Sequence, residues 1–379
     1  MFKRISSVLL LSAAISGCSL WGGSDEVEPS PLVDFDAEKQ VIVEWSRSIG
    51  GDLGDKFHQL TATISGDQIY AVSADGNVGA FALDDGEPRW EIDLDEAISA
   101  GAGAGDNKVV VVTEQGEAIC LDALTGGELW RKQLATEVTA EPQLNNELVV
   151  VQLINGSIVA LDSDTGVTRW RYDSLSPRLT LRGTSAPIVA LDVTLAGLDN
   201  GKFVALDNAS GATLWEQTVS YPEGRSELER MTDIDGRPML YEKVMYIPSF
   251  QGDLVAINPF NAQTLWKKKL SSYRSLASGF GNVYVSEAND HVQALDAKNA
   301  ASVWSQSQLE NRMLSAPAAF GNVVAVGDRE GYIHFLSQID GRFIARYDAD
   351  AAITSDMKTR GNRLFVLTDS GRLLALTLK

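Results

Sequence analysis

Short apolar runs separated by turn residues follow one another along most of the chain and predict β-strands. The run 108–113 is typical, and the runs Ile158–Asp162 and Phe203–Asp207 share one phrase of apolar residues that ends in aspartate. Runs of this length, bounded by glycine, asparagine or aspartate, are typical of strands and too short for helices. The sequence therefore predicts an all-β protein.

The same pattern recurs at a nearly constant interval. Seven tryptophans after residue 40 are separated by 45, 40, 40, 45, 51 and 38 residues: Trp45, Trp90, Trp130, Trp170, Trp215, Trp266 and Trp304. In six units a turn residue precedes the tryptophan by fourteen positions, as Gly116 precedes Trp130. A turn, a strand, a second turn and a tryptophan-bearing strand form a β-hairpin. Several strands in each ~40-residue repeat indicate the blades of a propeller.

The number of hairpin phrases predicts eight blades. Two phrases follow Trp304, at 331–336 and 371–376, and the chain ends before the last one reaches its tryptophan strand. Conversely, Val41–Trp45 is a tryptophan strand with no hairpin before it. We expect this N-terminal strand to complete the last blade, which would close the ring and remove an open edge. The prediction is an eight-bladed β-propeller of four-stranded blades over residues 40–379, with tryptophans that bridge neighbouring blades.

The N-terminus has the layout of a secretory signal peptide. Two basic residues precede the apolar stretch 5–15, which is too short to cross a membrane. The sequence Ile15–Cys18 (Ile-Ser-Gly-Cys) follows and resembles the bacterial lipobox, in which the cysteine receives a diacylglyceryl group. The resemblance implies a signal peptide over residues 1–17 and lipidation of Cys18. It also implies sorting to the outer membrane, because Ser19 rather than aspartate follows. Residues 18–39 then form an acidic, flexible tether that cannot bury a core.

Composition and isolated side chains exclude several classes of site. The formal net charge is −19, which repels phosphate backbones and argues against nucleic acid as a partner. His58, His291 and His334 are far apart and predict no metal triad. Residues 162–166 look like a calcium loop, but they repeat the hairpin turn of other blades. Cys120 lies in an apolar strand pattern typical of a small buried residue. We therefore expect no catalytic, cofactor or metal site.

Two adjacent connections between repeats are longer than those in most other repeats. Most units take 24 to 27 residues from a tryptophan to the next hairpin turn, but Trp170 to Gly201 takes 31 and Trp215 to Gly252 takes 37. The interval from Trp45 to residue 76 also takes 31. Insertions in repeat proteins map to loops, which often form the binding face. The two late insertions are therefore the candidate binding region.

Each late insertion contains candidate contact residues. Strand alternation places Leu179 and Leu181 on one face, with Arg182 beside them, although a strand that buries both leucines would show the same pattern. Asp233 and Asp235 lie in the second insertion, where solvated turn acids are the alternative. The spacing of Ser226 and Glu229 is that of a capping box and predicts a helical turn between them.

The repeats resemble the tryptophan-docking motif of quinoprotein alcohol dehydrogenases, which makes a quinone-dependent enzyme the alternative function. Those enzymes use two adjacent cysteines, calcium-binding side chains and a catalytic aspartate at the centre of the ring. This chain has no adjacent cysteines. A quinone cofactor is therefore not expected.

The whole chain resembles the BamB family, the propeller lipoproteins of the outer-membrane β-barrel assembly (Bam) machinery. The lipobox and the insertions Leu-Thr-Leu-Arg-Gly (179–183) and Asp-Ile-Asp (233–235) carry the specificity, because the repeats are shared with other propellers. The family often has Leu-Ser-Leu-Arg at the first motif, so Thr180 is a conservative departure.

The resemblance implies a non-catalytic scaffold that faces the periplasm and binds the POTRA domains of the core subunit, BamA. In this family the matching positions that contact the core subunit are Leu179, Leu181, Arg182, Asp233 and Asp235. Arg182 would pair with a carboxylate of the partner, while the aspartates would meet basic groups or orient Arg182. Direct binding of nascent outer-membrane proteins by exposed blade edges is the other candidate function.

Overall fold

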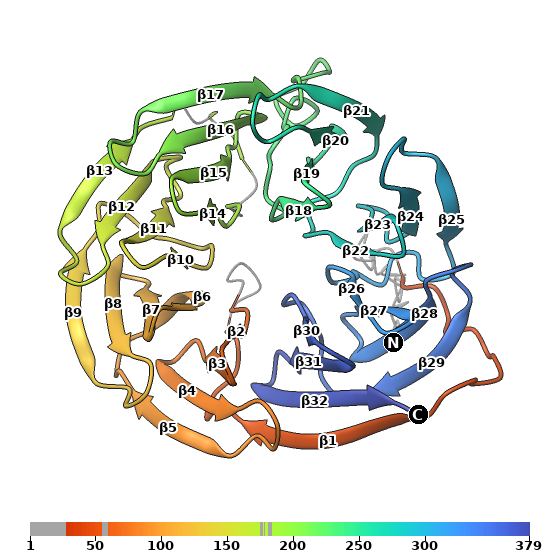
Figure 1. Ribbon diagram of the computed structural model, residues 1–379. Helices are drawn as coiled ribbons and strands as arrows, with labels where there is room; N and C mark the ends of the chain where they lie inside the picture. The colour runs from red at the N-terminus through yellow and green to blue at the C-terminus, as the bar shows by residue number, and fades with distance from the viewer. Residues whose placement is uncertain (1–27, 55–59, 175–176, 178, 181–183) are drawn as a thin grey trace, which may run out of the picture.

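The computed structural model describes residues 28–54, 60–174, 177, 179–180 and 184–379. The regular secondary structure of these residues is entirely β, and thirty-two strands form eight four-stranded sheets. Figure 1 shows the sheets as blades around a central axis, with the first strand of each blade innermost. The predicted eight-bladed β-propeller is confirmed. No helix in the described residues is long and apolar enough to span a membrane.

The first four blades follow one another in chain order, and each is an antiparallel meander. Blade 1 contains β2 (Thr63–Ser65), β3 (Gln68–Val72), β4 (Asn77–Ala82) and β5 (Pro88–Asp93). Blade 2 contains β6 (Ile98–Gly105), β7 (Lys108–Thr113), β8 (Glu117–Asp122) and β9 (Glu128–Gln133). Blade 3 contains β10 (Gln143–Leu144), β11 (Leu148–Gln152), β12 (Ile158–Asp162) and β13 (Thr168–Tyr172). Blade 4 contains β14 (Ile188–Val189), β15 (Val193–Gly197), β16 (Lys202–Asp207) and β17 (Thr213–Thr218).

The remaining blades repeat this order until the ring closes. Blade 5 contains β18 (Met239–Tyr241), β19 (Val244–Ile247), β20 (Asp253–Ile257) and β21 (Thr264–Lys269). Blade 6 contains β22 (Ala277–Gly279), β23 (Asn282–Ser286), β24 (Val292–Asp296) and β25 (Ser302–Gln306). Blade 7 contains β26 (Ala318–Phe320), β27 (Val323–Gly327), β28 (Tyr332–Ser337) and β29 (Phe343–Asp348). Blade 8 contains β30 (Lys358–Arg360), β31 (Arg363–Leu367), β32 (Arg372–Leu378) and, as its outer strand, β1 (Val41–Ser48).

Blade 8 joins the two ends of the chain, as the repeat count predicted. Strand β1 pairs antiparallel with β32, from Val41 opposite Leu378 to Ser48 opposite Arg372. Just beyond the strands, the Gln40 and Lys379 amides each donate to the other residue's carbonyl, at 2.9 and 3.0 Å. The outer edge of the last blade is thereby supplied from the far end of the chain, so no blade lacks a fourth strand.

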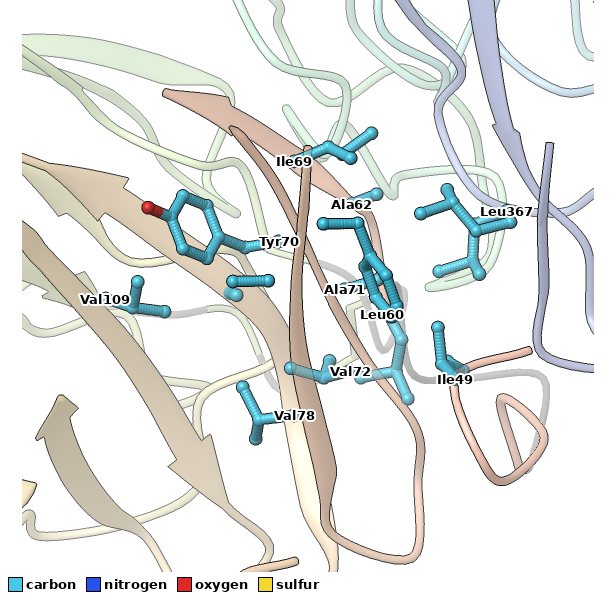
Figure 2. Packing of buried hydrophobic residues seen from close by; sticks show 14 of the residues in the cluster. Ile49, Leu60, Ala62, Ile69, Tyr70, Ala71, Val72, Val78, Val109 and Leu367 are labelled. Atoms are coloured by element: carbon cyan, nitrogen blue, oxygen red, sulfur yellow. The ribbon is translucent and has the colours of Figure 1, made fainter. Parts of the chain in front are cut away.

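Apolar side chains fill the spaces between neighbouring blades. Figure 2 shows Ile69 and Val78 of blade 1 between Val109 of blade 2 and Leu367 of blade 8, and all four are fully or almost fully buried. The second and third strands of the blades are mostly buried, whereas the outer strands alternate, so β9 buries Trp130 and exposes its neighbours. Stacking of blades therefore forms one continuous ring of core.

Six indoles tie each of their blades to the next. Trp130 Nε1 donates to the carbonyl of Ser163 in blade 3 at 2.9 Å, and the side chain is buried. Bonds of 2.7 to 3.2 Å join the same positions elsewhere in the ring: Trp45 to Leu83, Trp90 to Ala123, Trp170 to Asn208, Trp266 to Ala297 and Trp304 to Gln338. The tryptophans are thus structural, and each satisfies its one donor while covering apolar surface of the neighbour.

A glycine of the next blade lies against five of these indoles. Gly166 has φ 68°, and a Cβ there would lie 2.7 Å from the Trp130 ring. The same relation joins Gly86, Gly126, Gly211 and Gly341 to Trp45, Trp90, Trp170 and Trp304. Blades 5 and 6 have Ala262 and Ala300 at the equivalent turn position, with φ 57° and 61°. The preceding tryptophans, Trp215 and Trp266, are only half-buried. We attribute this to the alanine Cβ, which occupies space that the indole fills elsewhere.

The end of the acidic N-terminal segment lies against blade 7. Phe35 stacks on Phe343 with ring centroids 5.2 Å apart, and the Arg346 guanidinium lies 5.0 Å from the Phe35 centroid. Arg346 Nη2 also donates to the carbonyl of Val33 at 3.1 Å. These contacts hold residues 30–40, which we call the N-terminal arm, along the blade. Its composition predicted a tether but gave no sign of this docking.

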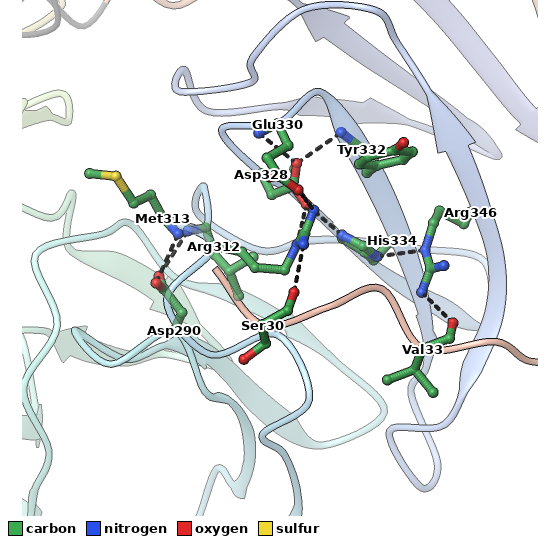
Figure 3. A network of polar contacts seen from close by, with 12 residues as sticks. Ser30, Val33, Asp290, Arg312, Met313, Asp328, Glu330, Tyr332, His334 and Arg346 are labelled. Carbon is green, nitrogen blue, oxygen red and sulfur yellow. Dashed lines mark hydrogen bonds and ion pairs between the residues drawn. The ribbon is translucent and has the colours of Figure 1, made fainter. Parts of the chain in front are cut away.

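A buried arginine fixes the start of the N-terminal arm (Figure 3). Arg312, with 1% of its side chain exposed, donates to the carbonyl of Ser30 at 2.8 Å and to Asp328 Oδ2 at 2.7 Å. Asp328 also contacts His334 Nε2 at 2.9 Å, and Glu330 takes another Arg312 N–H. Each charge in this network is paired, which offsets the cost of removing it from water.

The packing of glycine against the indoles predicts opposite effects on stability for two substitutions. We expect Gly166→Ala to lower the free energy of unfolding by about 1–3 kcal/mol, because the new Cβ meets Trp130 at a positive φ. We expect Ala262→Gly to raise it by up to about 1 kcal/mol, because glycine adopts this conformation without strain. Urea unfolding followed by tryptophan fluorescence measures both.

A third variant separates the two causes. Gly66 has a φ of 62°, similar to that of Gly166, but the Cβ of a Gly66→Ala variant would meet no atom within 4 Å. It should lose only the part of the stability that the positive φ costs. Equal losses for Gly66→Ala and Gly166→Ala would contradict the proposed role of the contact with Trp130.

Candidate partner-binding site

The two long connections leave the ring at the same end. The first joins β13 to β14 and the second joins β17 to β18, so each runs from the outer strand of one blade to the inner strand of the next. Val219 N donates to the carbonyl of Gly201 in the β15–β16 turn at 2.9 Å. We call this end, which carries the turns between second and third strands and both connections (173–187 and 219–238), the insertion end.

The two connections touch each other and the blade between them. Ser185 Oγ donates to the carbonyl of Gly236 at 3.3 Å. Ile234 lies so close to β15 that a Cβ on Gly197 would stand 2.3 Å from its Cγ2 atom. Glycine at residue 197 is therefore required by this close approach of the backbone. Neighbouring blades bring the two insertions together, as their adjacency in the sequence predicted.

Leu179 is the predicted contact residue that the structure exposes. Its side chain is 43% exposed, although a leucine in a regular blade strand would be buried. Four other exposed apolar residues belong to the same end of the ring: Ile154, Tyr221, Leu228 and Met313. Leu181 and Arg182, and Cys18 at the expected anchor, lie outside the described residues. Exposed apolar side chains on two insertions that touch each other suit a protein partner.

Asp233 and Asp235 lie beneath the surface of the insertion end. Their side chains are 1% and 6% exposed. Neither carboxyl oxygen of Asp235 has a hydrogen-bond partner in the described part of the chain. Burial, and then the nearby carboxylates of Asp233 and Asp199, raise the pKa of Asp235 well above its ordinary value. A partner cannot touch either aspartate in this conformation, so any role in binding is indirect.

The second connection carries the capping box that its spacing predicted. Glu229 Oε2 accepts from the Ser226 amide at 3.1 Å, and the Glu229 amide donates back to Ser226 Oγ at 3.2 Å. Arg230 N donates to the Ser226 carbonyl at 3.2 Å, which makes one helical turn. Backbone bonds from Arg225 and Ser226 lower the pKa of the Glu229 carboxyl. The exposed segment 221–230 is therefore a preformed loop.

The other candidate chemistry has structural explanations. Asp162 Oδ1 accepts from the Thr165 amide and hydroxyl at 2.9 and 2.7 Å, and Arg169 takes the other oxygen, so this carboxylate stabilises its turn. Burial raises the pKa of the Cys120 thiol to about 12, which leaves it protonated and inert. The described residues contain no group of three or more His, Cys, Asp or Glu side chains that could hold a metal ion.

The sequence and the fold both match a known family. A family model described as "Outer membrane protein assembly factor BamB" matches residues 74–306. An outer membrane protein assembly factor BamB from Pseudomonas aeruginosa is 42% identical over 376 residues, which are 99% of this chain and 98% of that protein. The chain belongs to the BamB family.

Solved structures agree with this assignment at the level of the fold. The crystal structure of BamB from Moraxella catarrhalis has a TM-score of 0.82 and 27% identity, and the match covers 89% of this chain and all of that one. The quinohemoprotein alcohol dehydrogenase of Comamonas testosteroni has a TM-score of 0.72 at 14% identity, covering 89% of this chain and 76% of that one. The latter shows the shared propeller fold alone, so it brings no enzymatic function to a BamB family member.

The unpaired carboxyl beneath the insertion end predicts a stabilising substitution. Because the pKa of Asp235 is raised in the folded state, ionisation at neutral pH opposes folding by about 1.4 kcal/mol for each unit of the shift. We expect Asp235→Asn to raise the thermal midpoint at pH 7.5. The gain should shrink as the pH falls towards the ordinary carboxyl pKa, where the wild-type group is protonated in both states.

Calorimetric melting curves of wild type and variant between pH 4.5 and 7.5 test this sign. Asp207→Asn is the matched control, because Asp207 accepts from Ser210 in an exposed turn and should lose stability when neutralised. A lower midpoint for Asp235→Asn at pH 7.5 would mean that the carboxylate is stabilised by a group at the insertion end.

Proposed function

We propose that this chain is a non-catalytic scaffold subunit of the outer-membrane β-barrel assembly machinery. Membership of the BamB family supports a place in that complex and association with the outer membrane. A lipid on Cys18 anchors the chain, and the propeller faces the periplasm. The N-terminal arm supports a short link between the two: only residues 19–29 separate Cys18 from Ser30, which Arg312 holds. The twelve residue-to-residue steps from Cys18 to Ser30 reach at most about 40 Å.

The insertion end is the surface that binds the POTRA domains of BamA in this proposal. One observation carries it: a rigid ring presents two touching insertions, with the apolar Leu179 exposed on one of them. Leu179 and Leu181 supply apolar anchor area, worth up to about 1.5–3 kcal/mol each when fully buried by the partner. Arg182 pairs with a carboxylate of BamA. Asp233 and Asp235 lie beneath this surface and contribute to it indirectly.

A binding experiment with matched variants tests this surface. The full chain, purified in detergent, is titrated with the POTRA domains of BamA. We expect the combined variant Leu179→Ala, Leu181→Ala and Arg182→Ala to weaken binding by about a hundredfold or more, because central apolar and arginine contacts dominate interface energies. An unchanged urea midpoint shows that the variant is folded.

The control removes the same kinds of side chain from the opposite end of the ring. Leu124, Ile339 and Lys298 are exposed in turns between third and fourth strands, so their triple alanine variant should bind like wild type. Equal loss in both variants, or in neither, would move the BamA contact away from the connections. Loss of all binding to wild type as well would reopen the function itself.

Direct binding of unfolded barrel strands is a second candidate with its own observation. The fourth strand of every blade ends its sheet, so eight outer strands have one edge without a partner in the described structure. Such edges can add an extended peptide by main-chain hydrogen bonds. Crosslinkers placed along β9 and β13 should trap nascent outer-membrane proteins in cells; a survey that traps none would exclude this activity.

A further inference from the structure

A cavity of about 550 Å³ opens in the central channel at the end of the ring opposite the insertion end. The inner strands that surround the channel are visible in Figure 1. Inner strands of every blade except blades 4 and 5 contribute to the lining, and Arg237 joins them from the end of the second connection. The lining includes Ile64, Ala104 and Thr359, which lie near the turns between first and second strands. Cavities of 300–1,000 Å³ are the usual size of small-molecule sites.

The charge of this cavity is opposite to that of the chain. Arg237, Lys358 and Arg360 line it, and Glu141 is the one acidic residue among the lining residues. Burial raises the pKa of Glu141, but Lys358 and Arg237 outweigh this and hold it below its ordinary value, so Glu141 is ionised. It neutralises one of the three cations. The mouth therefore keeps a net positive charge in a chain whose formal net charge is −19.

The basic groups keep unused hydrogen-bond donors inside the cavity. Lys358 Nζ stands 3.6 Å from Glu141 Oε2, and Arg237 Nη1 stands 3.7 Å from Glu141 Oε1. Both separations exceed the length of a charged hydrogen bond, which is about 2.7–2.9 Å. Arg237 Nη2 donates to Gln143 Oε1 at 2.5 Å, which fixes the position of the guanidinium. Lys358 makes no hydrogen bond within the described residues, so its three donors are available.

Acidic and basic groups are separated along the channel axis. A much smaller cavity continues inward and shares Glu141, Arg237 and Lys358, but its lining adds Asp235 and Asp356. Arg360 belongs to the outer cavity alone. The positive charge is therefore greatest at the mouth, where low-dielectric walls concentrate its field on an entering anion.

We propose that the channel mouth binds a small oxyanion, a molecule with carboxylate or phosphate groups, between Arg237 and Lys358. Arg237 recognises the planar or tetrahedral oxygens through its fixed guanidinium, and Lys358 supplies a point charge from the opposite side of Glu141. Arg360 at the rim attracts the anion. Arg237 comes from the last residues of the second connection, but Lys358 and Arg360 belong to β30 of blade 8 and are remote from Leu179, so the Lys358→Gln variant tests the site independently of that proposal.

Calorimetric titration of the full chain in detergent, with inorganic phosphate and with citrate at 0.15 M chloride, tests the site. We expect saturable binding of at least one probe with a Kd at or below about 1 mM. Arg237→Gln and Lys358→Gln should each weaken it at least about tenfold, the effect of losing a charged hydrogen bond. Glu141→Gln should strengthen binding several-fold, because it removes the competing carboxylate.

Lys267→Gln is the matched control, because it removes the same charge from the outer strand β21, where the side chain is 67% exposed. It should change the Kd by less than about twofold. Melting curves show that each variant is folded. A preference for citrate or for phosphate identifies the class of the natural ligand. Absence of saturable binding of both probes, or equal weakening by Lys267→Gln, would overturn the proposal.

Discussion

The docking of each tryptophan onto the next blade is the contact on which the rest of the molecule depends. A four-stranded blade buries its second and third strands only when neighbours cover both of its faces. The indole of the outer strand fixes the relative position of two blades, because its N–H donates to one carbonyl of the neighbour and its ring covers a glycine. Around the ring these contacts leave little freedom between blades, and pairing of β1 with β32 removes the last of it.

A rigid ring makes its ends the place for function. Strand positions repeat from blade to blade, so partner-specific surface can differ only in the connections and in the side chains that face the channel. The docking is also looser at the second connection, the longest one. Trp215 directly precedes the second connection and is half-buried, and both Ala262 and Ala300 lie at blades that follow the insertions. Blade 5 therefore follows the longest connection, and the two tryptophans that dock at its faces, Trp215 and Trp266, are the least buried of the set.

The fold was predictable from the sequence because its determinants are local and repeated. The interval between tryptophans, the glycine four residues before most of them and the unpaired strand at Val41–Trp45 fix the blade number and the closure. Docking of the N-terminal arm was not predictable. Arg312 binds a backbone carbonyl of a residue 282 positions away, and a backbone acceptor leaves no trace in side-chain pattern. The channel charges were equally hidden, since Glu141 precedes β10, Arg237 precedes β18 and Lys358 begins β30, which are far apart in the sequence.

The candidate site was predictable only in position. The longer intervals between repeats located both connections. The capping box at Ser226 was predicted correctly because it depends on two residues that are only three positions apart. The burial of Asp233 and Asp235 was not foreseeable, since an Asp-Ile-Asp sequence beside glycine has the composition of an exposed turn. Its burial follows from the approach of Ile234 to Gly197, which is a contact between separate elements.

The ring contains two kinds of buried carboxylate, and their difference bears on function. Asp328 is satisfied on all sides by Arg312, His334 and backbone amides, as a purely structural group should be. Asp235 is as deeply buried but has no hydrogen-bond partner in the described residues, and two further carboxylates face it. A group that lowers stability in this way is retained where another requirement outweighs stability, and such groups gather at functional sites. Asp235 lies where the second connection meets the channel, beneath the end of the ring that carries Leu179. An unfavourable buried carboxyl group thus lies directly under the surface proposed for the partner.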